Sequence, residues 1–219
     1  MRASSFDFMG NLDTLLAVIL GAVLATGGAL LAEIIQERLW RKRKERDAAR
    51  FFGEVLTSID ALVDLALSSQ KIGKPWGRVT RRFFQTALRE AAIYERNRER
   101  LFEIRDMQLR FDVHAHFLRE TVPITAVLEQ TEAIEAAERQ LADETLTGPA
   151  RAALEAELAQ EIRDRALSLE AVIYRRERSS ELITRLQKLA RVTFDQGYSD
   201  GAEDDADETE ARAASIERA

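Results

Sequence analysis

The sequence of 219 residues contains no cysteine, only two histidines and only three prolines. Without cysteine there is no disulfide framework and no thiol chemistry, and neither an oxidising nor a reducing compartment is excluded. Few residues interrupt helices after the N-terminal region, because four of the ten glycines lie at or before Gly28. The remainder is rich in Ala, Leu, Glu and Arg, which are strong helix formers. The composition therefore predicts long helices and an all-α fold.

The sequence also lacks the positive charge that nucleic-acid-binding domains usually carry, since its formal net charge is −6. We therefore expect no nucleic-acid partner. The charge is uneven: residues 41–120 carry 18 Lys and Arg against 12 Asp and Glu, whereas residues 121–219 carry 12 against 22. Opposite charge on the two halves favours their packing against each other, or antiparallel pairing of two copies.

Charged residues are absent from one long stretch, the 19 residues from Thr14 to Ala32. As a helix of about 1.5 Å per residue, this stretch covers roughly 29 Å, close to the hydrocarbon thickness of a bilayer. It predicts a single transmembrane helix over residues 11–37. A buried helix of a soluble domain is the first alternative. A cleaved signal peptide is the second, but the preceding region is nearly devoid of basic residues and contains Asp7 and Asp13.

Basic residues are concentrated on one side of this stretch. Arg2 is the single basic residue before it, and the residues after it include Arg38, Arg41, Lys42, Arg43, Lys44 and Arg46. Because Lys and Arg are retained on the cytoplasmic side, we expect residues 1–10 outside the cell membrane (inner or plasma membrane) and the rest of the chain in the cytoplasm. The same six residues, in a juxtamembrane helix over 38–50, are expected to contact anionic lipid.

Small residues recur along the predicted transmembrane helix. Ala17, Gly21, Ala25 and Ala29 are spaced by four, and Gly28 is their neighbour. Small residues let two helix backbones approach closely, which is a main route to helix association in lipid. We therefore expect a homo-oligomer formed through the membrane. The alternative is that Ala and Gly are simply common in membrane helices.

The predicted cytoplasmic helical domain covers residues 51–194. Its first helix continues to about Ser69, with Phe52, Leu56, Ile59, Val63 and Ala66 spaced by four and three as in a bundle or coiled-coil seam. Turn residues at 73–77, Pro123 and residues 143–148 then divide the chain into further helices over 79–120, 124–142 and 150–192. Short connections favour an antiparallel bundle or coiled-coil-like hairpins. Residues 195–219 are strongly acidic and are expected to be a disordered tail.

One turn combines an aromatic residue with several basic ones. The candidate contacts for a cytoplasmic protein partner there are Lys71, Lys74, Trp76, Arg78, Arg81 and Arg82. Such a set suits an anionic partner with Trp76 as an anchor. The alternative interpretation is an ordinary interhelical turn in which Trp76 covers the end of the bundle.

The two histidines are the only candidates for metal chemistry. On a helix, His116 shares a face with Asp112 and Glu120, whereas His114 points elsewhere. No recognised metal-ligand spacing is present, so we expect no metal site, no cofactor and no catalytic residue. A hydrolase using the His116 face is a minor alternative.

The pattern as a whole predicts a membrane-anchored helical interaction or scaffold protein. We expect it to self-associate in the lipid bilayer and to recruit a cytoplasmic partner, with no catalysis of its own. The alternative function is a subunit of an oligomeric membrane pore or transport complex gated by the soluble helices.

Overall fold

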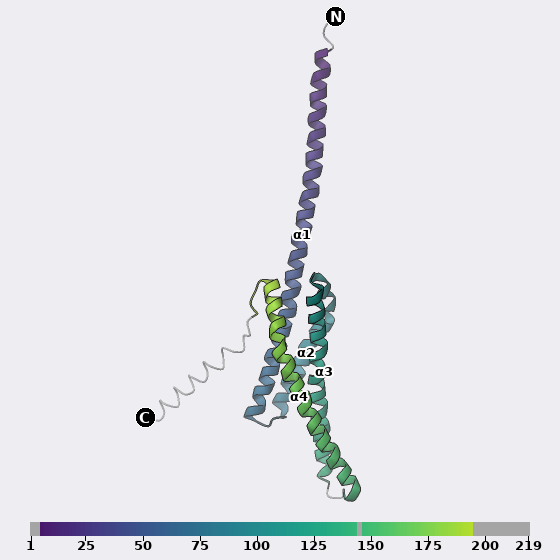
Figure 1. Ribbon diagram of the computed structural model, residues 1–219, viewed down its shortest axis with the longest axis vertical. Helices are drawn as coiled ribbons and strands as arrows, with labels where there is room; N and C mark the ends of the chain where they lie inside the picture. The colour runs from purple at the N-terminus through teal and green to yellow at the C-terminus, as the bar shows by residue number, and fades with distance from the viewer. Residues whose placement is uncertain (1–4, 144–145, 195–219) are drawn as a thin grey trace, which may run out of the picture. The chain divides into compact units, whose positions relative to one another are not determined.

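The computed structural model describes residues 5–143 and 146–194, with side chains from residue 16 onward, and these residues form helices and no strand. The all-α prediction is confirmed for this part of the chain. In order, the elements are α1 (Ser5–Ile72), α2 (Arg78–Arg96), the 3-10 helix η1 (Arg98–Glu103), α3 (Met107–Leu141) and α4 (Gly148–Ala190) (Figure 1). The chain divides into two compact units, Met1–Lys44 and Glu45–Ala219.

The described part of the first unit is the N-terminal part of α1. From Leu16 to Lys44 its side chains are almost all exposed, because no other element of this unit covers them. This helix is long and apolar enough to cross a membrane, and none of its most apolar stretch is buried. The coarse prediction of one apolar N-terminal helix is therefore confirmed.

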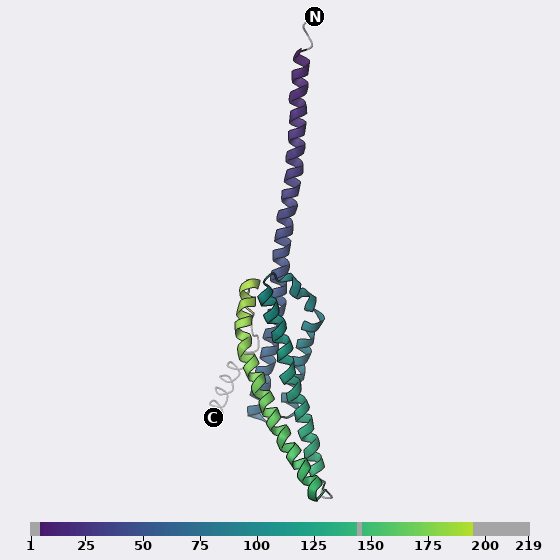
Figure 2. The ribbon, with the colours of Figure 1, turned by 45° about the vertical axis from the view of Figure 1, so that its right-hand side comes forward.

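The second unit is a helical bundle with its own core. The C-terminal part of α1 lies beside α2, α3 and α4, and α3 and α4 run antiparallel along much of their length (Figures 1 and 2). The predicted seam of α1 forms the centre of this core. Phe52, Leu56, Ile59, Val63 and Ala66 are all fully buried. Their spacing brings them to one side of the helix at about 100° per residue, which explains why the pattern could be read from the sequence.

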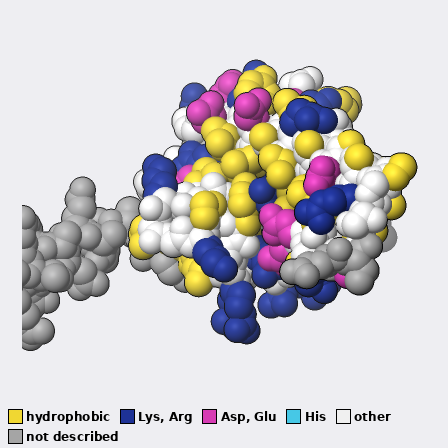
Figure 3. Space-filling model, turned by 90° about the horizontal axis from the view of Figure 1, so that it is seen from below, with side chains coloured by type: hydrophobic (Ala, Val, Ile, Leu, Met, Phe, Trp, Pro, Cys, Tyr) yellow, Lys and Arg dark blue, Asp and Glu magenta, His cyan; other side chains and the backbone are white. Residues whose placement is uncertain are grey.

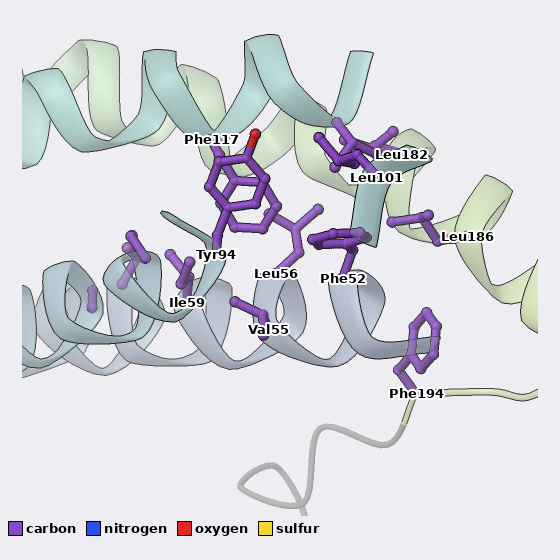
Figure 4. Close-up of a cluster of buried hydrophobic side chains, with 14 of the residues drawn as sticks. Phe52, Val55, Leu56, Ile59, Tyr94, Leu101, Phe117, Leu182, Leu186 and Phe194 are labelled. Carbon is purple, nitrogen blue, oxygen red and sulfur yellow. The ribbon is translucent and has the colours of Figure 1, made fainter. Parts of the chain in front are cut away.

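Three aromatic side chains from different helices meet at the centre of the core (Figure 4). The rings of Tyr94 on α2 and Phe117 on α3 are stacked, with their centroids 4.1 Å apart. Phe52 on α1 packs edge-on against both, at 5.8 Å from Tyr94 and 6.5 Å from Phe117. Because each ring comes from a separate helix, this cluster ties α1, α2 and α3 together.

The predicted helix boundaries around Pro123 were wrong. The break lies at residues 97–106, where Asn97 Nδ2 donates to the Ile93 carbonyl (2.8 Å) and the Asp106 carboxylate accepts the Gln108 and Leu109 N–H groups (2.9 and 3.1 Å). Pro123 lies inside α3. An interior proline removes one backbone hydrogen bond, at a cost of about 3 kcal/mol, and packing of α3 against α4 offsets this loss.

Two residues differ in burial from the segments around them. Ser179 is fully buried although the rest of residues 175–181 are exposed or half-buried, because its hydroxyl has a polar partner in Asp60 of α1. Phe102 is 80% exposed because it lies in η1 rather than on a continuous helix.

The last described residue closes the core against α1. The ring of Phe194 lies over Gly53, where a Cβ atom would meet the ring at 2.0 Å (Figure 4). Glycine is therefore the residue that lets this ring approach the helix. The predicted disordered acidic tail, residues 195–219, lies outside the described residues.

Candidate functional site

The small residues predicted to associate in the membrane are exposed on α1. Ala17, Gly21, Ala25, Gly28 and Ala29 all face open space, and a Cβ atom built on either glycine would meet no atom within 4 Å. Among residues 16–32, Thr26 is the one polar side chain, and its hydroxyl donates to the Ala22 carbonyl (2.8 Å) within the same helix. The five positions therefore present a surface of small apolar residues, and the role of this surface in association stays a prediction.

The basic residues that follow differ in their exposure, and their contact with anionic lipid stays a prediction. Arg38, Arg41, Lys42 and Arg43 are exposed, and Lys44 and Arg46 are half-buried. Two of the six have partners on the helix itself: Arg41 pairs with Glu37, and the Lys44 ammonium lies 3.9 Å from the centre of the Trp40 ring. Trp40 is 56% exposed, as suits a ring at a membrane interface.

The basic turn between α1 and α2 is only partly available to a partner. Lys71, Lys74, Arg78 and Arg82 are exposed. Arg81 donates to the Glu135 carboxylate on α3 (2.8 Å), and half-buried Trp76 packs against the core under the Arg165 guanidinium (4.3 Å). Trp76 thus covers the end of the bundle, as the interpretation of an ordinary interhelical turn expects. The four exposed basic groups are accessible to an anionic partner, as the partner-binding interpretation requires.

A groove of about 640 Å³ lies beside this turn. Its walls include Ile72, which is 88% exposed, and Val79, which is 61% exposed, together with Lys74 and Arg78. Figure 3, which views the molecule from below Figure 1, shows hydrophobic side chains grouped among Lys and Arg side chains. An apolar groove with a basic rim suits a protein segment that is apolar in the middle and acidic at its edges.

A cluster of buried polar side chains lies inside the bundle. Asp60 on α1 is 1% exposed, Ser179 on α4 is 0% exposed and Glu120 on α3 is 3% exposed. Within the described residues, one oxygen of Asp60, both oxygens of Glu120 and the Thr57 hydroxyl have no hydrogen-bond partner. Such groups are rare in folded proteins because each one costs about 1–3 kcal/mol.

The hydrogen bonds of Ser179 depend on the protonation of Asp60. The Ser179 hydroxyl oxygen is within bonding distance of both an Asp60 carboxyl oxygen and the Arg176 carbonyl (2.6 Å), yet a hydroxyl has one proton to donate. Ser179 donates to Asp60 when that group is ionised; when Asp60 is protonated, its O–H can donate to Ser179 and Ser179 to Arg176. Burial, opposed by the Ser179 hydrogen bond and reinforced by the Glu120 charge, raises the pKa of Asp60 to about 7.

The histidines occupy two different environments. His114 Nδ1 is hydrogen-bonded to the Tyr94 hydroxyl, and burial, with the Glu95 charge, raises the pKa of Tyr94 to about 12, so that this hydroxyl keeps its proton. His116 Nε2 lies 3.2 Å from a Glu120 oxygen, but the contact lacks hydrogen-bond geometry. Asp112, the other expected neighbour of His116, instead accepts from Arg185 on α4 (2.6 Å). In residues 5–143 and 146–194, no three His, Asp or Glu side chains are arranged to hold a metal ion.

Comparison with known proteins gives no family assignment: no family model, no curated protein and no solved structure matches this chain.

The Asp60 cluster was missed by sequence reasoning. Asp60 falls beside Ile59 in the seam, so its position predicts burial, but its partners lie 60 and 119 residues later in the sequence. The available signal was an acid at a core position of α1 together with a second acid, Glu120, at a core position of α3. That signal indicates a paired buried cluster without identifying Ser179.

Proposed function

We propose that this protein is a membrane-anchored helical interaction protein that self-associates and recruits a cytoplasmic partner. The observation that carries the proposal is the exposed apolar stretch of α1, which is long enough to span a bilayer, in a chain whose remaining described residues form a bundle with a closed core. Large exposed apolar surfaces on a protein of 32% charged residues require a covering medium, and a bilayer fits this length.

The orientation follows from the charge flanking this stretch. Six basic residues lie between residues 38 and 46, and only Arg2 precedes the stretch. The positive-inside rule places the helical domain in the cytoplasm and residues 1–10 outside. Anionic lipid adds about 1 kcal/mol for each basic residue near the surface, which holds the start of the domain close to the membrane.

The partner-binding role is supported by the groove beside the α1–α2 turn. Its apolar walls and basic rim fit a segment of a cytoplasmic protein with complementary charge, and Lys71, Lys74, Arg78 and Arg82 supply exposed positive groups around it. The proposal assigns the chain no catalytic step. The described part of the apolar stretch does not support the alternative function, a gated pore, because the Thr26 hydroxyl donates to a carbonyl of its own helix.

Because the chain has no native cysteine, single cysteines can report the topology directly. We expect Ser5→Cys to react with a membrane-impermeant maleimide on intact cells, and Ser68→Cys to react only after the cells are opened. Both variants should stay in membranes washed at alkaline pH, and deletion of residues 14–32 should release the protein.

Equal labelling of Ser68→Cys on intact cells would contradict the orientation. Release of the unmodified chain by the alkaline wash would contradict the anchor itself. Ser68 suits this test because its side chain is exposed at the end of α1 and lies outside the core.

A further inference from the structure

Helix α3 carries apolar side chains on two opposite faces. One face lies in the core and contains Leu109, Val113, Phe117, Ile124 and Val127. The other face, which we call the outer face of α3, contains Met107, Phe111, Leu118 and Val122, which are 73%, 61%, 46% and 67% exposed. At about 100° per residue these four lie within a sector of about 60°, opposite the core residues.

No helix of the bundle covers this outer face. Figure 2 shows the first half of α3 at the front of the bundle, with no helix drawn over it. The four side chains extend over roughly 22 Å of helix and expose a few hundred Å² of apolar surface. A patch of that size is comparable to the largest that a typical monomer exposes, and such patches often serve in binding.

The spacing of the outer face is the same in both chain directions. The four residues are separated by four, seven and four positions, so the pattern is symmetric about the point between His114 and Ala115. When two such faces pack antiparallel about a two-fold axis at that point, Met107 meets Val122 and Phe111 meets Leu118 of the other copy. Every apolar side chain then faces an apolar side chain, and Ala115 allows close approach at the axis.

The charges beside the outer face fit the same pairing. Arg119 is exposed and makes no ion pair with any described residue. Gln108 and Asp112 lie on the same flank of α3, and the two-fold operation places them opposite Arg119 of the other copy. Asp112 already accepts from Gln108 and Arg185, but a carboxylate has about four acceptor positions.

We propose that the outer face of α3 pairs antiparallel with the same face of a second copy of this chain. The inference rests on the proposed self-association and adds a cytoplasmic interface to it. With its polar flanks each copy contributes roughly 500 Å², which gives a total near the lower limit of about 1,000 Å² for a specific interface. The pairing is therefore expected to be reversible, and to be favoured by the high local concentration of anchored copies.

Single-cysteine variants of the full chain in lipid vesicles test this geometry. Under mild oxidation, Ala115→Cys should form a disulfide dimer with itself, because position 115 lies beside the two-fold axis. Met107→Cys and Val122→Cys should each give little dimer alone, and several-fold more when the two variants are reconstituted together. Leu167→Cys on α4 is the matched control, since Leu167 is 63% exposed and lies on another helix.

If Met107→Cys alone formed as much disulfide dimer as its mixture with Val122→Cys, the antiparallel pairing would be wrong, because residue 107 meets its own copy only in a parallel arrangement. If every α3 variant formed no more disulfide dimer than Leu167→Cys does, the proposed interface would be wrong. A second pair of variants separates this result from the proposed function. Phe111→Glu should abolish the Ala115→Cys dimer and Leu167→Glu should not. If unmodified protein is oligomeric in detergent while the α3 variants never cross-link, the interface fails and self-association stands.

Discussion

Replacing Phe117 by alanine is expected to lower the free energy of unfolding of the helical domain by about 3–5 kcal/mol. Phe117 is 1% exposed and stacks on Tyr94, with Phe52 packed against both rings. Removing the ring loses its burial and leaves a cavity, since the two remaining rings come from different helices and cannot close the space without moving those helices. Urea unfolding of the full chain in detergent, followed by circular dichroism, measures the change.

Phe102→Ala is the matched control for this prediction, because it removes the same ring from a residue that is 80% exposed. We expect its effect to stay within about 0.5 kcal/mol. Equal effects of the two substitutions would mean that the aromatic cluster is not the centre of the core. A loss of less than about 1 kcal/mol for Phe117→Ala would mean the same.

Replacing Asp60 by asparagine is expected to stabilise the helical domain at alkaline pH and to flatten its dependence on pH. The pKa of Asp60 is raised by burial from 3.8 to about 7. A raised pKa means that the folded state holds the proton more tightly than the unfolded state. The stabilisation is therefore complete below about pH 4 and is lost as the pH rises through about 7.

For the unmodified chain, this group alone lowers the free energy of unfolding by up to about 4 kcal/mol between pH 4 and pH 8.5. Asparagine keeps the size of the protonated carboxyl, donates an N–H to Ser179 and cannot ionise. The difference between variant and unmodified chain should therefore grow across that pH range. A constant difference would show that Asp60 is ionised in the folded state throughout.

The control for Asp60 must preserve the other charges that face it. Glu120 and His116 approach from α3 and Arg176 from α4, and all three affect the pKa of Asp60. Asp64→Asn, one turn further along α1, removes an acid that is already paired with Arg176 near the surface. Its effect is measured over the same range, between pH 4 and pH 8.5. A similar rise in both variants would place the titration outside the Asp60 cluster.

The sequence predicted those parts of the fold that depend on local periodicity. The seam of α1 follows from apolar spacing and is confirmed. The helix predicted over 150–192 is α4, which begins at Gly148 with a proline in its first turn. The break between α2 and α3 could not be placed in this way. Pro123 is a strong local signal, but long-range packing of α3 on α4 outweighs it, and the capping groups of Asn97 and Asp106 decide the break.

Some of the functional surfaces can likewise be predicted from local sequence, and others depend on contacts made only in the fold. Runs of like residues, such as the apolar stretch of α1 and the basic residues after it, are visible in the sequence. The Asp60 cluster depends on three helices that meet only in the fold. The outer face of α3 was not recognised because Met107, Phe111 and Leu118 were assigned to a helix over 79–120, whereas Val122 fell in the break expected at Pro123.

Absolute mass by light scattering tests the central claim of self-association most directly. The full chain would be measured in detergent beside Gly21→Ile, which places a bulky side chain on the small-residue face of α1, and beside Phe111→Glu. The proposed function predicts a protein mass of at least two 24.8 kDa chains, reduced in one or both variants. A mass of one chain for the unmodified protein at every concentration would contradict self-association.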